Sequence, residues 1–305
     1  MRIAVCERYQ MHTECIGPIY YMCKKLGHEC IVYTCEQDDC NMLPFFEKCF
    51  DDVIQTRNIS DIYRDADQFD FIVLNTSDEW NDIEIKMMGQ SKVVVLHHDQ
   101  KHENESMPNY FYLHPFKDEK DWIFPIYPCR YNHNKKASSS VMIIGTVNAF
   151  KDEYIPSKDL KAVERYLRKG KKLQVCARTI DDLEAYKTYP NLKVHLKKST
   201  DDMLSLINDI DFIWIPVHLD GSSIYNKTSF SGSISFGVNM NKIMIMPKVL
   251  QEAYGLNGVL TYEKDISEID LKKIDKIKLR KELDQWKQQR EMRNIELFKS
   301  KLSTK

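Results

Sequence analysis

Short apolar runs alternate with segments of helical periodicity along most of the chain. Runs such as Arg2–Cys6, Cys30–Thr34 and Phe212–Ile215 are too short for helices, which predicts buried strands. Between such runs, Leu160, Val163 and Leu167 place apolar side chains at i, i+3 and i+7, which is typical of a helix with one buried face. Buried strands that alternate with helices are typical of parallel sheets covered by helices, so the pattern predicts the α/β class.

The same pattern predicts most of the remaining elements. Helices are expected at Cys15–Leu26, Ile59–Ala66 and Trp80–Met88. Further strands are expected at Asp51–Ile54, Phe69–Asn75, Lys92–His97, Tyr110–His114, Val141–Val147, Lys172–Ala177, Leu192–Leu196, Asp211–Pro216, Ile243–Met246 and Val259–Glu263.

One polar, basic stretch interrupts this alternation. Arg130–Ser140 has no apolar face, and the strand and helix pattern restarts after it, so the stretch reads as a linker. We therefore predict two Rossmann-like domains, residues 1–135 and 136–305, that face each other across a cleft. A long polar helix from about Ile266 to the end is expected to pack back across both. Gly17 stands alone after the first strand, without the G-x-G-x-x-G motif, which disfavours NAD or FAD.

Composition excludes several classes of protein. The 305 residues carry 44 basic and 45 acidic side chains, which nearly cancel. The chain therefore lacks the large net charge that is typical of proteins that bind nucleic acid or membrane surfaces. No apolar run approaches the roughly 20 residues of a membrane span, and the first residues enter a strand without a signal peptide, so we expect a cytoplasmic protein. Seven of the nine cysteines lie in the first 49 residues without a C-x-x-C pair, which indicates reduced structural thiols rather than a zinc site.

The stretch Asp211–Pro247 carries the clearest functional pattern. It reads as a buried strand, a polar loop, a helix opened by Ser231-Gly232-Ser233, and a second buried strand. A glycine-bearing turn at a helix N-terminus can aim backbone N–H groups at an anion, although serine is also a common N-cap. Lys151 and Arg178 follow predicted strands, where ligands of open α/β sheets bind, but either could be a solvated surface residue.

Four segments combine a predicted strand or helix with a turn or loop at its end: Ile143–Asp152, Leu173–Thr179, Ser199–Val217 and Ser229–Pro247. They resemble the donor domain of GT-B nucleotide-sugar glycosyltransferases, in particular the retaining group that contains glycogen and sucrose synthases. The resemblance implies a nucleoside diphosphate held by Gly145, Thr146, Asn148, Lys151, Arg178, Tyr225, Lys227, Ser229, Ser231, Gly232 and Ser233. The sequence departs from that group in two ways. Thr146 stands where an arginine is usual, and Thr228 and Phe236 stand where the group has a pair of glutamates.

The resemblance implies transfer of a sugar from a nucleoside-diphosphate sugar to a hydroxyl of a glycan or a small molecule, without a metal. An inverting reaction needs a base, for which the candidates are His12, Glu14 and the favoured pair His98-Asp99, since a carboxylate beside an imidazole can orient it. His114 is a further candidate. Two alternatives share the fold: a nucleotide-sugar 2-epimerase, and a degenerate scaffold that binds a partner.

Overall fold

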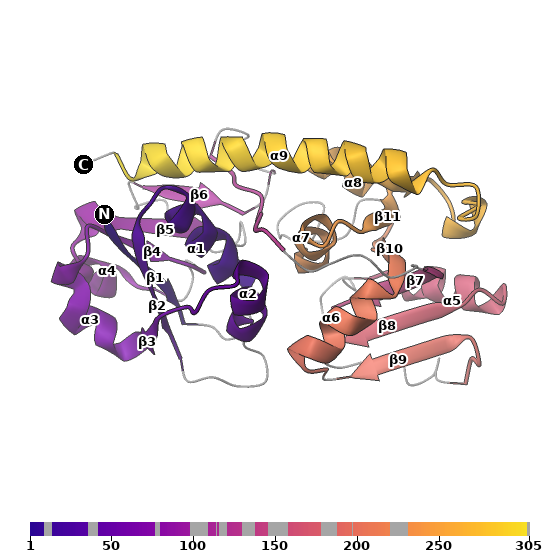
Figure 1. Cartoon of the computed structure of the whole chain (residues 1–305), viewed down its shortest axis with the longest axis horizontal. Helices are drawn as coiled ribbons and strands as arrows, with labels where there is room; N and C mark the ends of the chain where they lie inside the picture. Colours follow the sequence, from indigo (N-terminus) through magenta and orange to yellow (C-terminus); the bar gives the residue numbers. More distant parts are fainter. Residues whose placement is uncertain are drawn as a thin grey trace. The chain divides into compact units, whose positions relative to one another are not determined.

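The computed structural model describes residues 1–8, 14–35, 42–76, 80–97, 109–113, 115, 121–129, 138–145, 158–177, 188–196, 198–219 and 231–303. The chain divides into two compact units (Figure 1). The first unit comprises Met1–Arg130, Thr228–Phe230 and Gln288–Lys305, and the second comprises Tyr131–Lys227 and Ser231–Lys287. The expected boundary between residues 135 and 136 falls outside the described residues.

The first unit is built on a six-stranded parallel sheet with the order β3-β2-β1-β4-β5-β6. Ile3, Ala4, Val5 and Cys6 in its central strand are all fully buried, as expected when helices cover both faces of a parallel sheet. Its strands are β1 (Arg2–Glu7), β2 (Glu29–Thr34), β3 (Thr56–Asn58), β4 (Phe71–Leu74), β5 (Val93–His97) and β6 (Tyr110–Tyr112). Its helices are α1 (Ile16–Lys25), α2 (Leu43–Phe50), α3 (Ile62–Asp65) and α4 (Asp82–Met88).

Helix α2 was not predicted, and the strand expected at Asp51–Ile54 is wrong. The helix has Pro44 in its first turn, buries Phe45 and Phe46, and ends where Asp51 takes a left-handed conformation at φ 54°. The strand begins only at Thr56, after this reversal. Close packing requires a glycine at position 17, since a Cβ at Gly17 would lie 2.2 Å from the ring of Phe46.

The second unit repeats the same plan with the order β12-β11-β10-β7-β8-β9, again parallel throughout. Its core joins Val163 and Tyr166 of one helix to Phe212 and Trp214 of the sheet. Its strands are β7 (Ser138–Ile144), β8 (Leu173–Ala177), β9 (Leu192–Leu196), β10 (Ile210–Trp214), β11 (Ile243–Pro247) and β12 (Leu260–Tyr262). Its helices are α5 (Leu160–Arg168), α6 (Thr200–Asn208), α7 (Gly232–Asn239) and α8 (Lys248–Tyr254).

The long polar helix expected from Ile266 begins later. A short 3₁₀ turn covers Ile266–Glu268, and the last helix, α9, runs from Lys276 to Lys301. Residues of α9 up to Lys287 belong to the second unit and those from Gln288 onward belong to the first. In the second unit, the buried Asp211 accepts a hydrogen bond from Arg280 Nη2 at 2.6 Å and a further one from Lys276 Nζ. These contacts fix the first turns of α9 on the amino end of β10.

Both sheets have the same topological switch point. In each, the first strand lies between the second and the fourth strand of its unit, so the chain order reverses between β1 and β4 and between β7 and β10. Ligands of open α/β sheets bind outside the carboxyl ends of the strands at such a point. The expected α/β class with two Rossmann-like sheets is therefore confirmed, and each sheet offers one place to look for a site. No helix within the described ranges has the length and apolar character needed to cross a membrane.

Candidate functional site

The switch point of the second unit begins where β7 ends. Gly145 follows Ile144 with φ +90°, a conformation that L side chains rarely adopt, and its N–H donates to the carbonyl oxygen of Cys176 at 3.0 Å. A Cβ at Gly145 would lie 3.3 Å from Ser233 Oγ and 3.7 Å from Lys158 Nζ. A glycine is needed here both for the backbone turn and for the close approach of these two side chains.

The N-terminus of α7 lies against this turn. Ser233 Oγ, in the first turn of α7, donates to the carbonyl oxygen of Ile144 at 2.8 Å. Ser231 is the N-cap and is buried, but its side chain makes no capping hydrogen bond. The first N–H groups of a helix have no partner within the helix, and its dipole favours negative charge there. The end of β7 and the start of α7 thus bring together two predicted segments that lie far apart in the sequence.

Lys158 supplies a cation at the same place. Its Nζ donates to the same carbonyl oxygen of Ile144 at 2.8 Å, and the side chain is only 5% exposed. Burial lowers the pKa of Lys158 to about 7, and no carboxylate in the described part of the chain acts to raise it. An ammonium group has three N–H donors, and within the described part of the chain one carbonyl is the only hydrogen-bond partner of this one.

Two hydrogen bonds of the following residue hold Lys158 in position. The next residue, Asp159, is the N-cap of α5, and its Oδ1 accepts from the backbone N–H of Ala162 at 3.0 Å. The backbone N–H of Asp159 donates to the carbonyl oxygen of Pro216, just beyond β10, at 2.5 Å. His218 follows two residues later, and its Nε2 is buried with no hydrogen-bond partner among the described residues. Lys158 is therefore fixed between the ends of β7 and β10.

The structure describes four of the predicted donor-site residues. Of the predicted set, Gly145, Ser231, Gly232 and Ser233 are brought to one edge of the sheet. The others lie outside the described residues: Thr146, Asn148, Lys151, Arg178, Tyr225, Lys227 and Ser229. Sequence reasoning missed Lys158 and His218. Their signals were a lysine directly before the helix start at Asp159 and a histidine directly after the Asp211–Pro216 run.

The switch point of the first unit has a different character. Glu7 is the last residue of β1 and is fully buried, and its Oε2 accepts a hydrogen bond from Thr76 Oγ1 at 2.9 Å. Asn75 follows β4 and is also fully buried, and its N–H donates to the carbonyl oxygen of Cys6 at 2.9 Å. Thr76 has φ 54°, which is uncommon for a residue other than glycine. A carboxylate and a carboxamide thus meet where β1 and β4 end.

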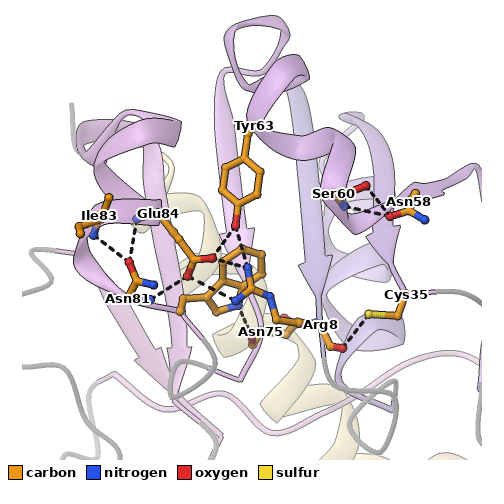
Figure 2. Close-up of polar contacts among 10 residues, drawn as sticks. Arg8, Cys35, Asn58, Ser60, Tyr63, Asn75, Asn81, Ile83 and Glu84 are labelled. Atoms are coloured by element: carbon orange, nitrogen blue, oxygen red, sulfur yellow. Dashed lines mark hydrogen bonds and ion pairs between the residues drawn. The ribbon is translucent and has the colours of Figure 1, made fainter.

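A polar cluster next to this edge holds the end of β1 in place (Figure 2). Arg8 Nη2 donates to Glu84 Oε1 and to Tyr63 OH, both at 2.7 Å, and its guanidinium carbon lies 4.1 Å from the ring centroid of Trp80. Glu84 also accepts from the N–H of Asn81 in the capping box of α4. These hydrogen bonds, led by that of Arg8, lower the pKa of Glu84 to about 2. The cluster joins the chain after β1 to α3 and α4.

Of the four main candidates for the catalytic base, His12, Glu14, His98 and Asp99, one lies within the described residues. Glu14 directly precedes Cys15, the N-cap of α1. Burial, and then the charges of Glu14 and Glu7, raise the pKa of the Cys15 thiol. His12, His98 and Asp99 lie outside the described residues, as does His114. Sequence reasoning did not single out Glu7 or Asn75, although each is a polar residue at the end of an apolar run.

Comparisons with known proteins identify the fold. No protein-family model matches the chain, and no curated protein matches its sequence. A glycosyltransferase from Rickettsia africae ESF-5 is 13% identical with a TM-score of 0.58, covering 98% of this chain and 96% of that chain. AviGT4, a glycosyltransferase involved in avilamycin A biosynthesis, is 11% identical with a TM-score of 0.57, covering 99% of this chain and 97% of that chain. An α-glucosyltransferase in complex with UDP and a 13-mer DNA is 12% identical with a TM-score of 0.53, covering 98% of this chain and 95% of that chain. The two six-stranded units thus have the GT-B fold of these glycosyltransferases.

Proposed function

We propose that the protein transfers a sugar from a nucleoside-diphosphate sugar to a hydroxyl group of a glycan or small molecule. The observation that carries this proposal is Lys158, whose buried ammonium group lies at the switch point of the second sheet and has one carbonyl as its hydrogen-bond partner among the described residues. The glycine turn at Gly145 and the N-terminus of α7 lie beside it. Together they form a small, cationic, N–H-rich edge that suits a diphosphate.

The chemistry of sugar transfer gives these groups a task. The sugar leaves a diphosphate whose negative charge grows in the transition state, and cations or N–H dipoles that face it stabilise that charge. One such preorganised contact supplies about 2–4 kcal/mol of transition-state stabilisation. A diphosphate beside Lys158 would also raise the pKa of this lysine from its value of about 7, since an opposite charge favours the ammonium form.

The rest of the donor site is proposed on the resemblance. Thr146, Asn148, Lys151, Arg178, Tyr225, Lys227 and Ser229 are expected to complete it. No carboxylate lies between Asp220 and Glu252, so we propose that hydroxyl and amide groups bind the ribose and the sugar. The base would come from the first unit, with His98-Asp99, His12 and Glu14 as candidates. Because Lys158 supplies positive charge, we expect the donor to bind without a divalent metal.

The test is a nucleotide screen followed by a turnover assay. Melting temperatures are measured with UDP, GDP and ADP at millimolar concentration in EDTA, and we expect one of them to raise the melting temperature. The matching nucleotide sugar is then incubated with hydroxyl acceptors, and a glycosylated product is sought by mass spectrometry. No shift with any of the three nucleotides would contradict the proposal. Release of nucleotide with an epimerised sugar and no acceptor product would indicate an epimerase instead.

A further inference from the structure

The side chain of Asn75 stands out in the first unit. It is fully buried, and among the described residues neither its Oδ1 nor its Nδ2 has a hydrogen-bond partner. Its backbone, by contrast, is held on both sides, because its N–H donates to the carbonyl of Cys6 at 2.9 Å and its carbonyl accepts from Trp80 Nε1 at 3.3 Å. The carboxamide is thus fixed in place but unpaired.

Another buried asparagine of the same unit shows how such a group is usually satisfied. Asn294 is 3% exposed, and its Oδ1 accepts from the N–H of Phe124 at 3.2 Å while its Nδ2 donates to the carbonyl of Phe124 at 2.5 Å. Across the described ranges, Asn75 is the one side chain with two buried polar atoms that lack partners. Leaving a buried amide unpaired destabilises a fold, so such a group calls for a specific explanation.

The strand register places a carboxylate beside it. Cys6 and Leu74 are partners in the β1–β4 ladder, and both contribute to the core under α3 and α4. Because successive residues of a strand point to opposite faces, the next residues, Glu7 and Asn75, share the other face. Both lie at the switch point, where open α/β sheets bind ligands. Arg8 points to the opposite face, where it is bound to Glu84.

The chemistry of this pair favours hydroxyl groups as ligands. A carboxamide offers donors and an acceptor, and a carboxylate offers acceptors only, which suits hydroxyls that both donate and accept. We propose that Asn75, with Glu7, binds a polyhydroxylated ligand and determines specificity for it. This assignment rests on the proposed function, in which the ligand would be the hydroxyl acceptor of the sugar.

The experiment compares Asn75→Leu with the matched control Asn294→Leu, since leucine has the same number and branching of non-hydrogen side-chain atoms as asparagine. Removing an unpaired buried carboxamide should raise the melting temperature of the free protein by about 2–4 °C, whereas removing the paired one should lower it. Ligand binding is followed by saturation-transfer NMR with methyl α-D-glucopyranoside, methyl α-D-galactopyranoside, methyl α-D-mannopyranoside and myo-inositol. We expect at least one probe to bind the wild-type protein and Asn294→Leu, and at least a tenfold weaker signal with Asn75→Leu.

Three results would overturn the inference. One is a melting temperature that falls in Asn75→Leu as it does in Asn294→Leu, which would mean that the carboxamide is paired in solution, for example by an ordered water. The second is a probe that binds Asn75→Leu as well as it binds the wild type. The third is that none of the four probes binds the wild type. The melting-temperature shift with UDP, GDP or ADP is measured on the wild type and on both variants. Its absence from all three proteins would contradict the proposed function but not the glycoside site.

Discussion

The two switch points occupy the same place in sheets of the same strand order, but their side chains are opposite in character. The second unit places the Lys158 ammonium and the N-terminus of α7 there, whereas the first places the Glu7 carboxylate and the Asn75 carboxamide. The backbone plan fixes where a ligand can bind, and a few side chains decide what kind of ligand it is. A cationic edge suits a diphosphate, and an edge of carboxylate and amide suits hydroxyls.

Two buried lysines in the second unit allow a role in ligand binding to be distinguished from a purely structural role. Lys242 donates to the carbonyl of Ile210 at 2.9 Å, much as Lys158 donates to Ile144, but it lies at the amino end of the sheet. Burial lowers the pKa of Lys242 to about 8, and Arg280 adds to that shift while Asp211 and Asp209 oppose it. Among the described residues, carboxylates thus raise the pKa of Lys242 and none raises that of Lys158, which makes Lys242 a structural control for Lys158.

The largest expected effect comes from removing the cation of the second switch point. Lys158→Met should weaken binding of the matching nucleoside diphosphate about 100-fold, because a charge-assisted contact with the diphosphate is lost. Lys242→Met should leave this affinity within about twofold. Isothermal titration calorimetry at pH 7 measures both. Equal losses in the two variants would remove the distinction between the two lysines.

The same substitution should stabilise the free protein. The folded pKa of Lys158 is about 7, below its ordinary value of about 10.4, so the unfolded chain binds more protons between these values and the stability due to this group rises with pH. The destabilisation caused by burying the charged Lys158 is fully present below pH 7 and disappears toward pH 10. We expect the gain in urea midpoint of Lys158→Met over the wild type to be largest at pH 6.5 and much smaller at pH 9.5. A gain in urea midpoint that increased with pH would contradict the lowered pKa of the buried Lys158.

Two glycines test whether the close approach at the second switch point matters. Gly145 and Gly170 both have positive φ, at 90° and 71°, but a Cβ at Gly170 would meet nothing within 4 Å. Gly170→Ala should therefore cost only the backbone strain of about 1–2 kcal/mol. Gly145→Ala should cost at least as much and also weaken nucleotide binding, because its Cβ crowds Ser233. Urea unfolding and calorimetry measure the two effects, and unchanged nucleotide binding in Gly145→Ala would argue against a site there.

The smallest effect is expected beside the first switch point. The folded pKa of Glu84 is about 2, below its ordinary value of 4.5, so the stability from this group is present above pH 4.5 and is lost as pH falls toward 2. Glu84→Gln should lower the urea midpoint slightly at pH 7 and remove that part of the acid sensitivity. Nucleotide binding should not change. Measuring the urea midpoint at pH 7 and pH 3.5 checks this, and an unchanged acid sensitivity would mean that the Arg8 cluster does not hold the carboxylate.

Much of the fold and part of the site could be predicted from the sequence. Buried parallel strands are continuous apolar runs, and Ser231-Gly232-Ser233 has both a turn composition and a helix after it, so local pattern was enough. The prediction of a strand at Asp51–Ile54 was wrong because the apolar residues before it form α2. A short apolar run does not distinguish a buried helix from a strand. Lys158 and Asn75 have suggestive positions, before a helix start and after an apolar run, but local pattern does not show that they are buried. The sequence does not distinguish a buried lysine or an unpaired carboxamide from a solvated residue of the same type, because only tertiary packing makes them unusual.

The most direct test of the central claim is proton uptake on nucleotide binding. At pH 8 Lys158 is mostly neutral in the free protein, since its pKa is about 7, and a bound diphosphate should restore its charge. Calorimetry of the matching nucleoside diphosphate is run in two buffers with different ionisation enthalpies, on the wild type and on Lys158→Met. We expect the wild type to take up most of one proton and the variant to take up none beyond that of the nucleotide itself. Equal uptake by the two proteins would show that Lys158 does not face the diphosphate.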